Sequence, residues 1–270
     1  MIIDFHTHMF PDKIAESTIK TLEKSIEDVS RRSVKAVIGG NLDALKESMR
    51  INGIDYSVVL PIATTVTQSK TINNFAQSIN GRDGIFSFGS LHPMQENWEE
   101  TLEDIKKKGL LGIKLHPEYQ QCYVNEKETI RILKKCRELG LYTVFHAGND
   151  HGIKPPRHCT PKQLREALDY VEGDMIIAAH LGGWTMWDEV EKYLVGTPIM
   201  FDTAFTKDFI ETEQLLRIIK NHGSKKILFA TDSPWENQGD SAAFFKALPI
   251  EDNEKDDIMY KNAKKLLKIY

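Results

Sequence analysis

The sequence predicts an α/β protein that folds over residues 1–270 as a single (β/α)8 TIM barrel with an additional C-terminal helix. Eight short runs are almost continuously apolar, as expected for parallel strands that are covered on both faces. Longer segments with helically spaced apolar residues separate these runs. No flexible linker or repeat divides the chain, so we expect one domain. An open doubly wound sheet is the competing architecture, but no G-x-G-x-x-G follows the first run, which weakens its dinucleotide-binding version.

The expected strands and helices alternate along the whole chain. The strands are Ile2–His6, Tyr56–Pro61, Ile85–Leu91, Leu111–Leu115, Tyr142–His146, Met175–Ala179, Pro198–Asp202 and Lys226–Ala230. The helices between them are Leu42–Ile51, Ile72–Gly81, Trp98–Lys108, Glu126–Leu139, Pro161–Val171, Met186–Leu194 and Asp208–Asn221. Thr160 before Pro161 is typical of a helix N-cap, and Gly140 and Gly223 lie where helices end. Glu251–Tyr270 is predicted to be the additional helix, packed outside the barrel with a solvated Lys-rich face.

Composition and charge exclude several classes of protein. The net charge of −4 leaves no basic surface for nucleic acid. Three cysteines form neither a disulfide framework nor a C-x-x-C motif, which indicates a reducing compartment. The chain begins without an export signal, and no run approaches the roughly 20 apolar residues of a membrane span. We therefore expect a soluble cytoplasmic protein that acts on a small molecule, with no nucleic-acid or membrane partner.

Side chains that can bind metal gather at the carboxyl ends of the predicted strands. In order along the chain they are His6 and His8 after the first strand, His116 after the fourth, His146 after the fifth, His180 after the sixth and Asp232 after the eighth. Five of the nine histidines belong to this set. Because the carboxyl ends of barrel strands meet at one rim, we expect these side chains to converge.

The His-Thr-His pair has a specific geometric meaning. Side chains at positions i and i+2 of a strand point to the same face, so His6 and His8 can reach one ion. His146 and Asp232 would complete a nitrogen and oxygen shell that suits zinc, or iron, cobalt or manganese. No cysteine belongs to the set, which argues against a closed structural zinc site. The sequence thus predicts one catalytic divalent metal with a position open to water.

The motifs around these residues resemble the amidohydrolase superfamily. Within it, the chain resembles the amidohydrolase-related branch that includes aminocarboxymuconate-semialdehyde decarboxylase and γ-resorcylate decarboxylase. The matching segments are Ile3–Pro11, Gly112–Pro117, His146–Gly148, His180–Gly183 and Thr231–Pro234, in the family's order. The resemblance implies a barrel that binds one divalent metal, usually zinc, through His6, His8, His146 and Asp232. It also implies that His180 is the acid/base or carbonyl-polarising residue.

Lys114 and His116 separate two versions of the metal site. Binuclear amidohydrolases bridge two ions with a carbamylated lysine of the fourth strand, and Lys114 lies near that strand. Lys114 and His116 also form an i, i+2 pair that can face the pocket together. We favour a single ion with Lys114 or His116 contacting substrate, and keep a second ion as the alternative. The related barrels often pair, so a homodimer is compatible with the resemblance.

Several functions suit this set of residues. The leading prediction is a hydrolase of a cyclic amide, lactone or ester, in which Asp232 takes a proton from metal-activated water and His180 stabilises the oxyanion. The alternative is a zinc-dependent, non-oxidative decarboxylase of a small carboxylated aromatic or muconate-type acid, protonated by His180 or Asp232. A DNase of the TatD type or a non-catalytic binding barrel fits less well, because the chain is acidic and pairs a general base with an open metal position.

Other residues admit two interpretations. Trp184 and Trp235 follow His180 and Asp232 closely, so either can be a wall of the substrate pocket or a packing residue between helices. His151 and His158 lie in the long Gly148–Cys159 segment, either a lid or a solvated loop. The role of His92 stays open. We expect His222 to be exposed at a helix C-terminus, where the helix dipole favours it.

Overall fold

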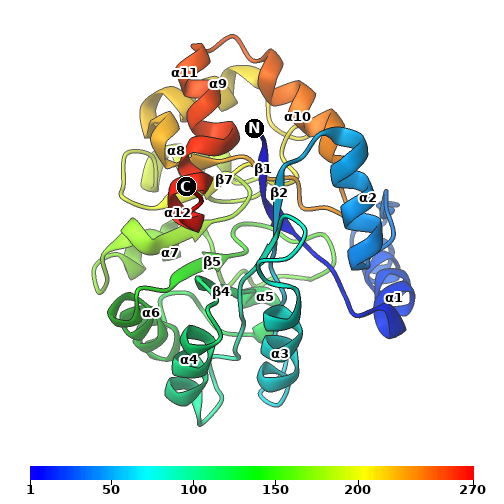
Figure 1. Ribbon diagram of the computed structural model, residues 1–270. Helices are drawn as coiled ribbons and strands as arrows, with labels where there is room; N and C mark the ends of the chain where they lie inside the picture. Colours follow the sequence, from blue (N-terminus) through cyan, green and yellow to red (C-terminus); the bar gives the residue numbers. More distant parts are fainter.

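Eight parallel strands form the centre of the structure, a computed structural model that describes residues 1–270 (Figure 1). In chain order they are β1 (Ile3–Thr7), β2 (Tyr56–Val59), β3 (Ile85–Ser87), β4 (Gly112–Leu115), β5 (Tyr142–Phe145), β6 (Ile176–Ala178), β7 (Met200–Asp202) and β8 (Ile227–Leu228). Seven lie inside the runs predicted for them, and β1 extends one residue further, to Thr7. The strands pair in the orders β1-β2-β3 and β4-β5-β6-β7-β8.

Backbone hydrogen bonds join the two sheets on both sides. Just beyond β3, the Gly89 amide donates to the carbonyl oxygen of Gly112 in β4 at 2.8 Å. On the opposite side, the Phe5 amide of β1 donates to the carbonyl oxygen of Phe229, which directly follows β8, at 2.9 Å. The strands therefore follow one another in the cyclic order of a (β/α)8 barrel, and the predicted fold class is confirmed.

Helices lie between successive strands as the sequence predicts. They are α2 (Leu42–Asn52), α3 (Ser69–Ile79), α4 (Trp98–Lys107), α6 (Lys127–Leu139), α7 (Pro161–Ala167), α8 (Trp187–Tyr193) and α9 (Thr212–His222). The Thr160 side chain caps α7 together with Gln163, and Gly140 ends α6 in the left-handed conformation. Short helical turns α5 (Pro117–Gln120), η1 (Gly173–Met175) and η2 (Ser224–Lys226) occupy the connections.

Two helices of the structure are absent from the elements that the sequence predicts. Helix α1 (Asp12–Ser30) follows β1, and α10 (Gln238–Ala247) follows the segment after β8. Gly239 and Ser241 near the start of α10 weaken its helical pattern, whereas α1 has helically spaced apolar residues that the sequence analysis did not use. Helix α1 lies at the side of the barrel in Figure 1, and only Ala15 and Ile19 of its residues are buried. Gly40 makes room for Ile19, because a Cβ atom at Gly40 would lie 2.7 Å from the Ile19 side chain.

The C-terminal segment packs differently from the prediction. The single helix expected over Glu251–Tyr270 consists of α11 (Asp252–Asp256), the π-helical stretch η3 (Asp257–Lys261) and α12 (Asn262–Leu267). Leu266 and Leu267 are buried with residues of the barrel interior, not against its outer helices. Partly buried Tyr56 and Met200, which begin β2 and β7, pack against the same cluster. The helix therefore covers the end of the barrel where the strands begin, because this end would otherwise expose apolar side chains.

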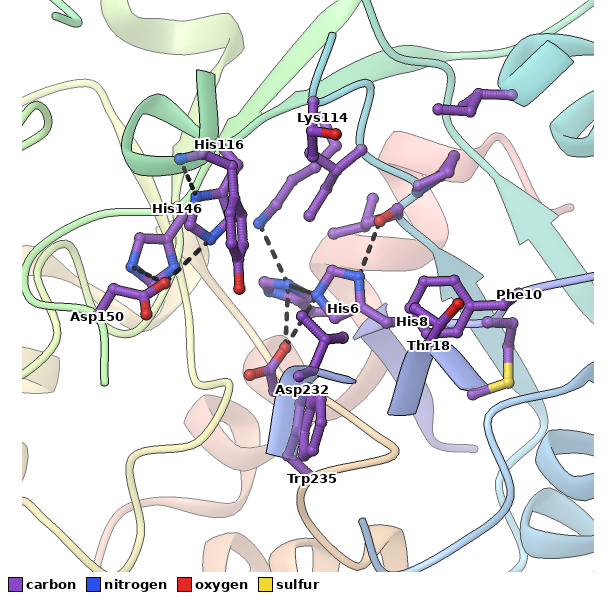
Figure 2. Close-up of a pocket in the computed structure, with 18 of the residues that line it drawn as sticks. His6, His8, Phe10, Thr18, Lys114, His116, His146, Asp150, Asp232 and Trp235 are labelled. Atoms are coloured by element: carbon purple, nitrogen blue, oxygen red, sulfur yellow. Dashed lines mark hydrogen bonds and ion pairs between the residues drawn. The ribbon is translucent and has the colours of Figure 1, made fainter. Parts of the chain in front are cut away.

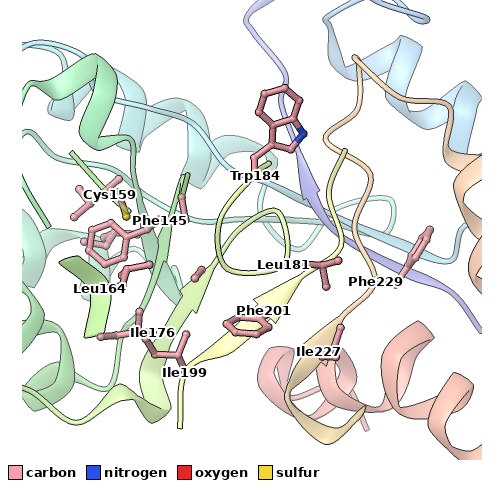
Figure 3. Close-up of a cluster of buried hydrophobic side chains, with 14 of the residues drawn as sticks. Phe145, Cys159, Leu164, Ile176, Leu181, Trp184, Ile199, Phe201, Ile227 and Phe229 are labelled. Atoms are coloured by element: carbon pink, nitrogen blue, oxygen red, sulfur yellow. The ribbon is translucent and has the colours of Figure 1, made fainter. Parts of the chain in front are cut away.

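Two apolar clusters hold the barrel together. A cluster of 13 buried residues, including Phe5, Val58 and Val144, fills the interior, so that the centre of the barrel is packed. A larger cluster of 46 residues lies between strands and helices, and Figure 3 shows Phe145, Leu164 and other members of it. With the interior filled and the lower end covered, the rim at the carboxyl ends of the strands is left open for a site.

Candidate metal centre

A cavity of about 580 Å³ opens at the carboxyl ends of the strands. Every residue that the sequence analysis assigned to the site lines this cavity: His6, His8, Lys114, His116, His146, His180, Trp184, Asp232 and Trp235. Figure 2 shows the polar members, with His6, His8 and Asp232 in the middle and His116 and His146 to one side. The barrel thus brings together residues that are up to 229 positions apart, counted from His6 to Trp235.

A local irregularity of β1 orients the first histidine. The pairing of β1 with β2 shifts register between Asp4 and Thr7. Such irregularities re-aim side chains. Here Phe5 packs in the barrel interior, whereas its neighbour His6 lines the cavity. The two residues therefore serve the core and the site from adjacent positions.

Hydrogen bonds decide which ring nitrogen of His6 and His8 faces the cavity. His6 Nδ1 lies 2.9 Å from Asp202 Oδ2, and His8 Nδ1 lies 2.9 Å from the Leu60 carbonyl oxygen. Both oxygens accept, so the partners assign the proton of each neutral ring to Nδ1. The Nε2 atoms are then unprotonated, and they lie 3.0 Å apart. Burial, assisted by the Lys114 ammonium, lowers the pKa of His6 well below its usual value.

Asp232 brings a carboxylate to the same point. Its Oδ1 lies 3.3 Å from His6 Nε2 and 3.1 Å from His8 Nε2. The backbone of Asp232 is left-handed, with φ of 64°. Non-glycine residues in this conformation are uncommon and cluster at functional sites.

The three groups have the chemistry of a divalent-metal site. Unprotonated ring nitrogens and a carboxylate oxygen repel one another unless a cation lies among them, and all three ligand atoms lie within 4.8 Å of one another. The carboxylate of Asp202 behind His6 is the partner that metal-binding histidines usually have. Nitrogen and oxygen donors without cysteine suit zinc, manganese, iron or cobalt. The residues present therefore fit a divalent ion.

Lys114 reaches the floor of the cavity from β4. Its side chain is fully buried, and its Nζ lies 3.2 Å from His6 Nε2. Burial lowers the pKa of Lys114 to about 8, and the nearby carboxylates of Asp202 and Asp232 oppose this shift. An amine thus lies directly beside the candidate metal ligands.

His146 and His180 form a second pair of facing imidazoles. His180 Nδ1 lies 2.8 Å from the Ala204 carbonyl oxygen, and His146 Nε2 lies 3.0 Å from the Asn149 carbonyl oxygen. These partners leave His180 Nε2 and His146 Nδ1 to face each other at 3.0 Å, an arrangement that suits a proton or a cation between them. The His6 and His180 rings lie 5.4 Å apart.

His146 also belongs to a second group of potential ligands. His116, His146 and Asp150 have ligand atoms within 4.8 Å of one another, whereas the group around His6, His8 and Asp232 does not include His146. His116 Nε2 lies 3.4 Å from Asp150 Oδ2, and the His116 and His146 rings stack at 4.2 Å. Burial lowers the pKa of both rings well below its usual value. The structure therefore places His146 with His116 and Asp150, and in contact with His180.

Comparison with known proteins identifies the family. Residues 3–269 match the amidohydrolase family. The chain belongs to this family. None of the curated proteins compared with the sequence matches it.

Solved structures of low sequence identity share the fold of this chain. The 5-carboxyvanillate decarboxylase of Sphingomonas paucimobilis superposes with a TM-score of 0.69 at 14% identity, covering 100% of this chain and 99% of that one. A dihydroxybenzoic acid decarboxylase of a Polaromonas species, with bound manganese and the inhibitor 2-nitroresorcinol, gives 0.68 at 16% identity, covering 99% and 96%. An uncharacterised TIM-barrel protein of Bordetella bronchiseptica gives 0.74 at 14% identity, covering 99% and 98%. These likenesses confirm the barrel fold of the chain.

The cavity has aromatic walls. Trp184 Nε1 donates to the Phe205 carbonyl oxygen at 3.1 Å, which fixes the ring against the pocket. The His151 ring lies 4.2 Å from that of Trp184 and also lines the cavity, and its buried Nε2 has no hydrogen-bond partner. Of the remaining histidines, His92 and His158 are buried outside the cavity.

His158 ties the loop after β5 to the turn after β4. Glu118 accepts from the His158 amide at 2.7 Å, and its second oxygen lies 2.8 Å from His158 Nδ1. Both side chains are buried. The hydrogen bonds to Glu118 therefore anchor the loop that carries Asp150 into the cavity.

Sequence reasoning missed two carboxylates of the site. Asp202 ends β7, and the strand-end argument that found Asp232 applies to it equally. Asp202 also accepts from the His180 amide at 2.9 Å, so one side chain positions two histidines. Asp150 carries no comparable signal, because it lies within an irregular loop whose path the sequence pattern does not predict.

Among the helices of the structure, none combines the length and the apolar character that a membrane-spanning helix needs.

Proposed function

We propose that the protein is a metal-dependent, non-oxidative decarboxylase of an aromatic or similarly unsaturated carboxylic acid. The observation that carries this proposal is the buried Lys114 amine, 3.2 Å from His6 Nε2, at the floor of a cavity whose walls include aromatic and aliphatic side chains. An ammonium beside a cation attracts a carboxylate, and apolar walls suit the ring that bears it. A neutral lactone or amide would make no use of the lysine charge.

The solved structures support the same choice. The Sphingomonas and Polaromonas proteins that share the fold are decarboxylases of aromatic acids. Their low identity carries the fold alone, so the argument for the reaction rests on the cavity of this chain. The two lines agree on a carboxylated ring as substrate.

We propose that His6, His8 and Asp232 hold a divalent ion and that His146 is the fourth ligand. The bound ion supplies Lewis-acid stabilisation of negative charge on substrate oxygen atoms. Manganese is bound in the Polaromonas structure, and the donor set of this chain accepts manganese as well as zinc. His6→Ala is expected to abolish stoichiometric metal binding while the far-ultraviolet circular dichroism stays unchanged, since catalytic sites contribute less to folding than structural ones. An unfolded variant would contradict this.

The residues around the ion divide the work of the reaction. Lys114 pairs with the substrate carboxylate and orients it, and the aromatic wall at Trp184 confines the ring. Decarboxylation breaks the bond between the ring carbon and the carboxyl carbon, leaves the electron pair on the ring and releases CO2. His180, held through Nδ1 by the Ala204 carbonyl oxygen, acts as an imidazolium: its protonated Nε2 delivers the proton that forms the new C–H bond, and water then reprotonates the neutral ring.

The test is product analysis of the metal-loaded protein. Hydroxybenzoates, carboxyvanillates and muconate-type acids are offered in D2O, with CO2 release and deuterium at the vacated carbon as readouts. Lactones and cyclic amides are offered in parallel in H2¹⁸O. CO2 release with one deuterium per product is the expected result, and Lys114→Met should lower it strongly. Hydrolysis with ¹⁸O incorporation and no CO2 from any acid would overturn the proposal.

One observation favours hydrolysis as a second candidate. The Asp232 carboxylate lies beside His6 and His8 and lines the cavity, so it can accept a proton from a water molecule there. The same group serves as a metal ligand in either reaction. The ¹⁸O arm of the experiment therefore decides between them.

A further inference from the structure

Helix α1 presents a row of side chains to the cavity instead of to the core. Ile14, Thr18, Leu22 and Ile26 all line it, at intervals of four residues. Residues four apart on a helix lie on one face, so the row is continuous. The opposite side of α1 carries the exposed pair Glu16 and Lys20. The helix is thus amphipathic towards a cavity.

Apolar side chains of α3 face the same space. Ile72 and Phe75 of α3 line the cavity and are only partly buried, as are Leu22 and Ile26. Figure 2 shows Thr18 and Phe10 on the side of His8 that faces away from His116 and His146. The cavity therefore has a polar floor at the candidate metal centre and an apolar compartment beside it.

The position of α1 is fixed by contacts at its far end. Ser25 Oγ donates to the Gly152 carbonyl oxygen at 3.1 Å, which joins α1 to the loop after β5. Glu23 accepts from the Ala36 amide at 3.0 Å and pairs with Lys35. These contacts therefore hold in place the wall that α1 contributes to the apolar compartment.

The volume of the cavity indicates a substrate that is larger than a single ring. About 580 Å³ falls within the range of roughly 300–1,000 Å³ that holds drug-sized ligands. A carboxylate bound at Lys114 with a single ring above it leaves the α1 compartment empty, and apolar surface left facing water gives no binding energy. A larger apolar body would cover it.

We propose that Ile14, Leu22 and Ile26 of α1, with Ile72 and Phe75 of α3, form a subsite for a hydrophobic substituent of the substrate. The substrate is then a carboxylic acid whose apolar body extends beyond one ring. The subsite and the metal centre share one cavity, which is why the occupant is the substrate and not a second protein. The statement that the substrate is a carboxylic acid rests on the proposed decarboxylase function. The statement that the cavity has an apolar subsite does not.

The test is calorimetric binding of matched acids to the metal-loaded His180→Asn protein, because the natural protein would decarboxylate a substrate acid during the titration. A one-ring hydroxybenzoate is compared with the same acid bearing a butyl or phenyl substituent opposite the carboxylate. The extended acid is expected to bind about tenfold or more tightly than the parent. Leu22→Ala should remove most of this advantage and leave the parent acid unchanged, whereas Lys20→Ala on the outer face of α1 should change neither. Leu22→Trp, which fills the compartment, should reject the extended acid.

Each outcome separates the subsite from the reaction. Equal binding of parent and extended acids, or equal effects of Leu22→Ala and Lys20→Ala, would overturn the subsite even if CO2 is released. An extended lactone that gains affinity through Leu22 while no acid is decarboxylated would keep the subsite and overturn the proposed reaction. A change of oligomeric state in Leu22→Ala, measured by light scattering, would assign the row to contact between copies and also overturn the subsite.

Discussion

At the residue scale, the site depends on side chains that fix the protons of other side chains. Asp202 accepts from His6 Nδ1 and from the His180 amide, and the Leu60 carbonyl accepts from His8 Nδ1. These bonds turn Nε2 of both metal-binding candidates toward Asp232. The His-Thr-His motif thus identifies the two candidate ligands. Which ring nitrogen of each is free to bind a metal depends on a hydrogen-bond partner that lies far away in the sequence.

Asp202→Asn is predicted to weaken metal binding about 10- to 100-fold, although Asp202 is not itself a candidate ligand. The amide removes the charge behind His6 and no longer requires the proton on Nδ1. Competition of the apoprotein with a fluorescent chelator measures the change. Glu236→Gln is the control, because it neutralises another buried carboxylate, which pairs with Lys207 and does not line the cavity. Equal affinities of the two variants would contradict the prediction.

His180→Asn is predicted to keep the metal and lower kcat by about 100-fold or more, because it removes the group that delivers the proton. Metal content and single-turnover rates are measured on the same samples. His92→Asn serves as the control, since His92 is buried but does not line the cavity. Near-normal turnover of His180→Asn would assign that residue a structural role.

At the element scale, connections decide where the loops of the rim run. The turn after β5 packs against the turn after β6 through backbone, with Gly148 pairing to Trp184. Gly148 has a φ of 88°, and a Cβ atom there would lie 2.2 Å from the Trp184 amide nitrogen. A side chain at this position would force apart the loops that carry Asp150 and Trp184.

Gly148→Ala is predicted to lower the free energy of unfolding by about 2–3 kcal/mol, from backbone strain together with this clash. Urea denaturation followed by circular dichroism measures the loss. Gly196→Ala is the control, because Gly196 has a similar φ of 85° but open space where its Cβ would lie. The control should lose only about 1 kcal/mol; losses of the same size in both variants would show that the clash contributes nothing.

At the scale of the whole molecule, burial overrides a local helix signal at His222. We expected an exposed residue at the end of a helix; instead His222 is 3% exposed and stacks on Phe201 with ring centroids 3.9 Å apart. Its Nδ1 accepts from the Gly196 amide at 3.2 Å and its Nε2 donates to the Ile199 carbonyl at 2.9 Å. Burial, together with the Lys226 charge, lowers the pKa of His222 to about 4.

This shift makes folding stability depend on pH. The unfolded chain, with an ordinary histidine pKa near 6.5, binds more protons than the folded one between pH 6.5 and 4. The contribution of His222 is therefore complete above about pH 6.5 and is lost as the pH falls, by up to about 3 kcal/mol. His222→Gln should flatten this part of the profile in urea titrations at several pH values. A variant with the same slope as the natural protein would refute the assignment.

The sequence by itself determined the strands, their order and the residues that gather at the rim. Apolar runs covered on both faces leave few alternatives to a parallel sheet, and strand-end residues such as His6, His146 and Asp232 must then share one edge. Helix α1 was not predicted, although its apolar residues Ile14, Leu22 and Ile26 have helical spacing.

Only the tertiary structure decided which neighbours these residues meet. The C-terminal helix covers the lower end of the barrel because Leu266 and Leu267 find the interior cluster there, a contact that helical periodicity does not specify. Asp150 lines the cavity because of the path of the loop after β5. The row of side chains on α1 lines it because of where the chain places this helix after β1. Long-range packing sets these positions, since each depends on residues far away in the chain and not on the local pattern.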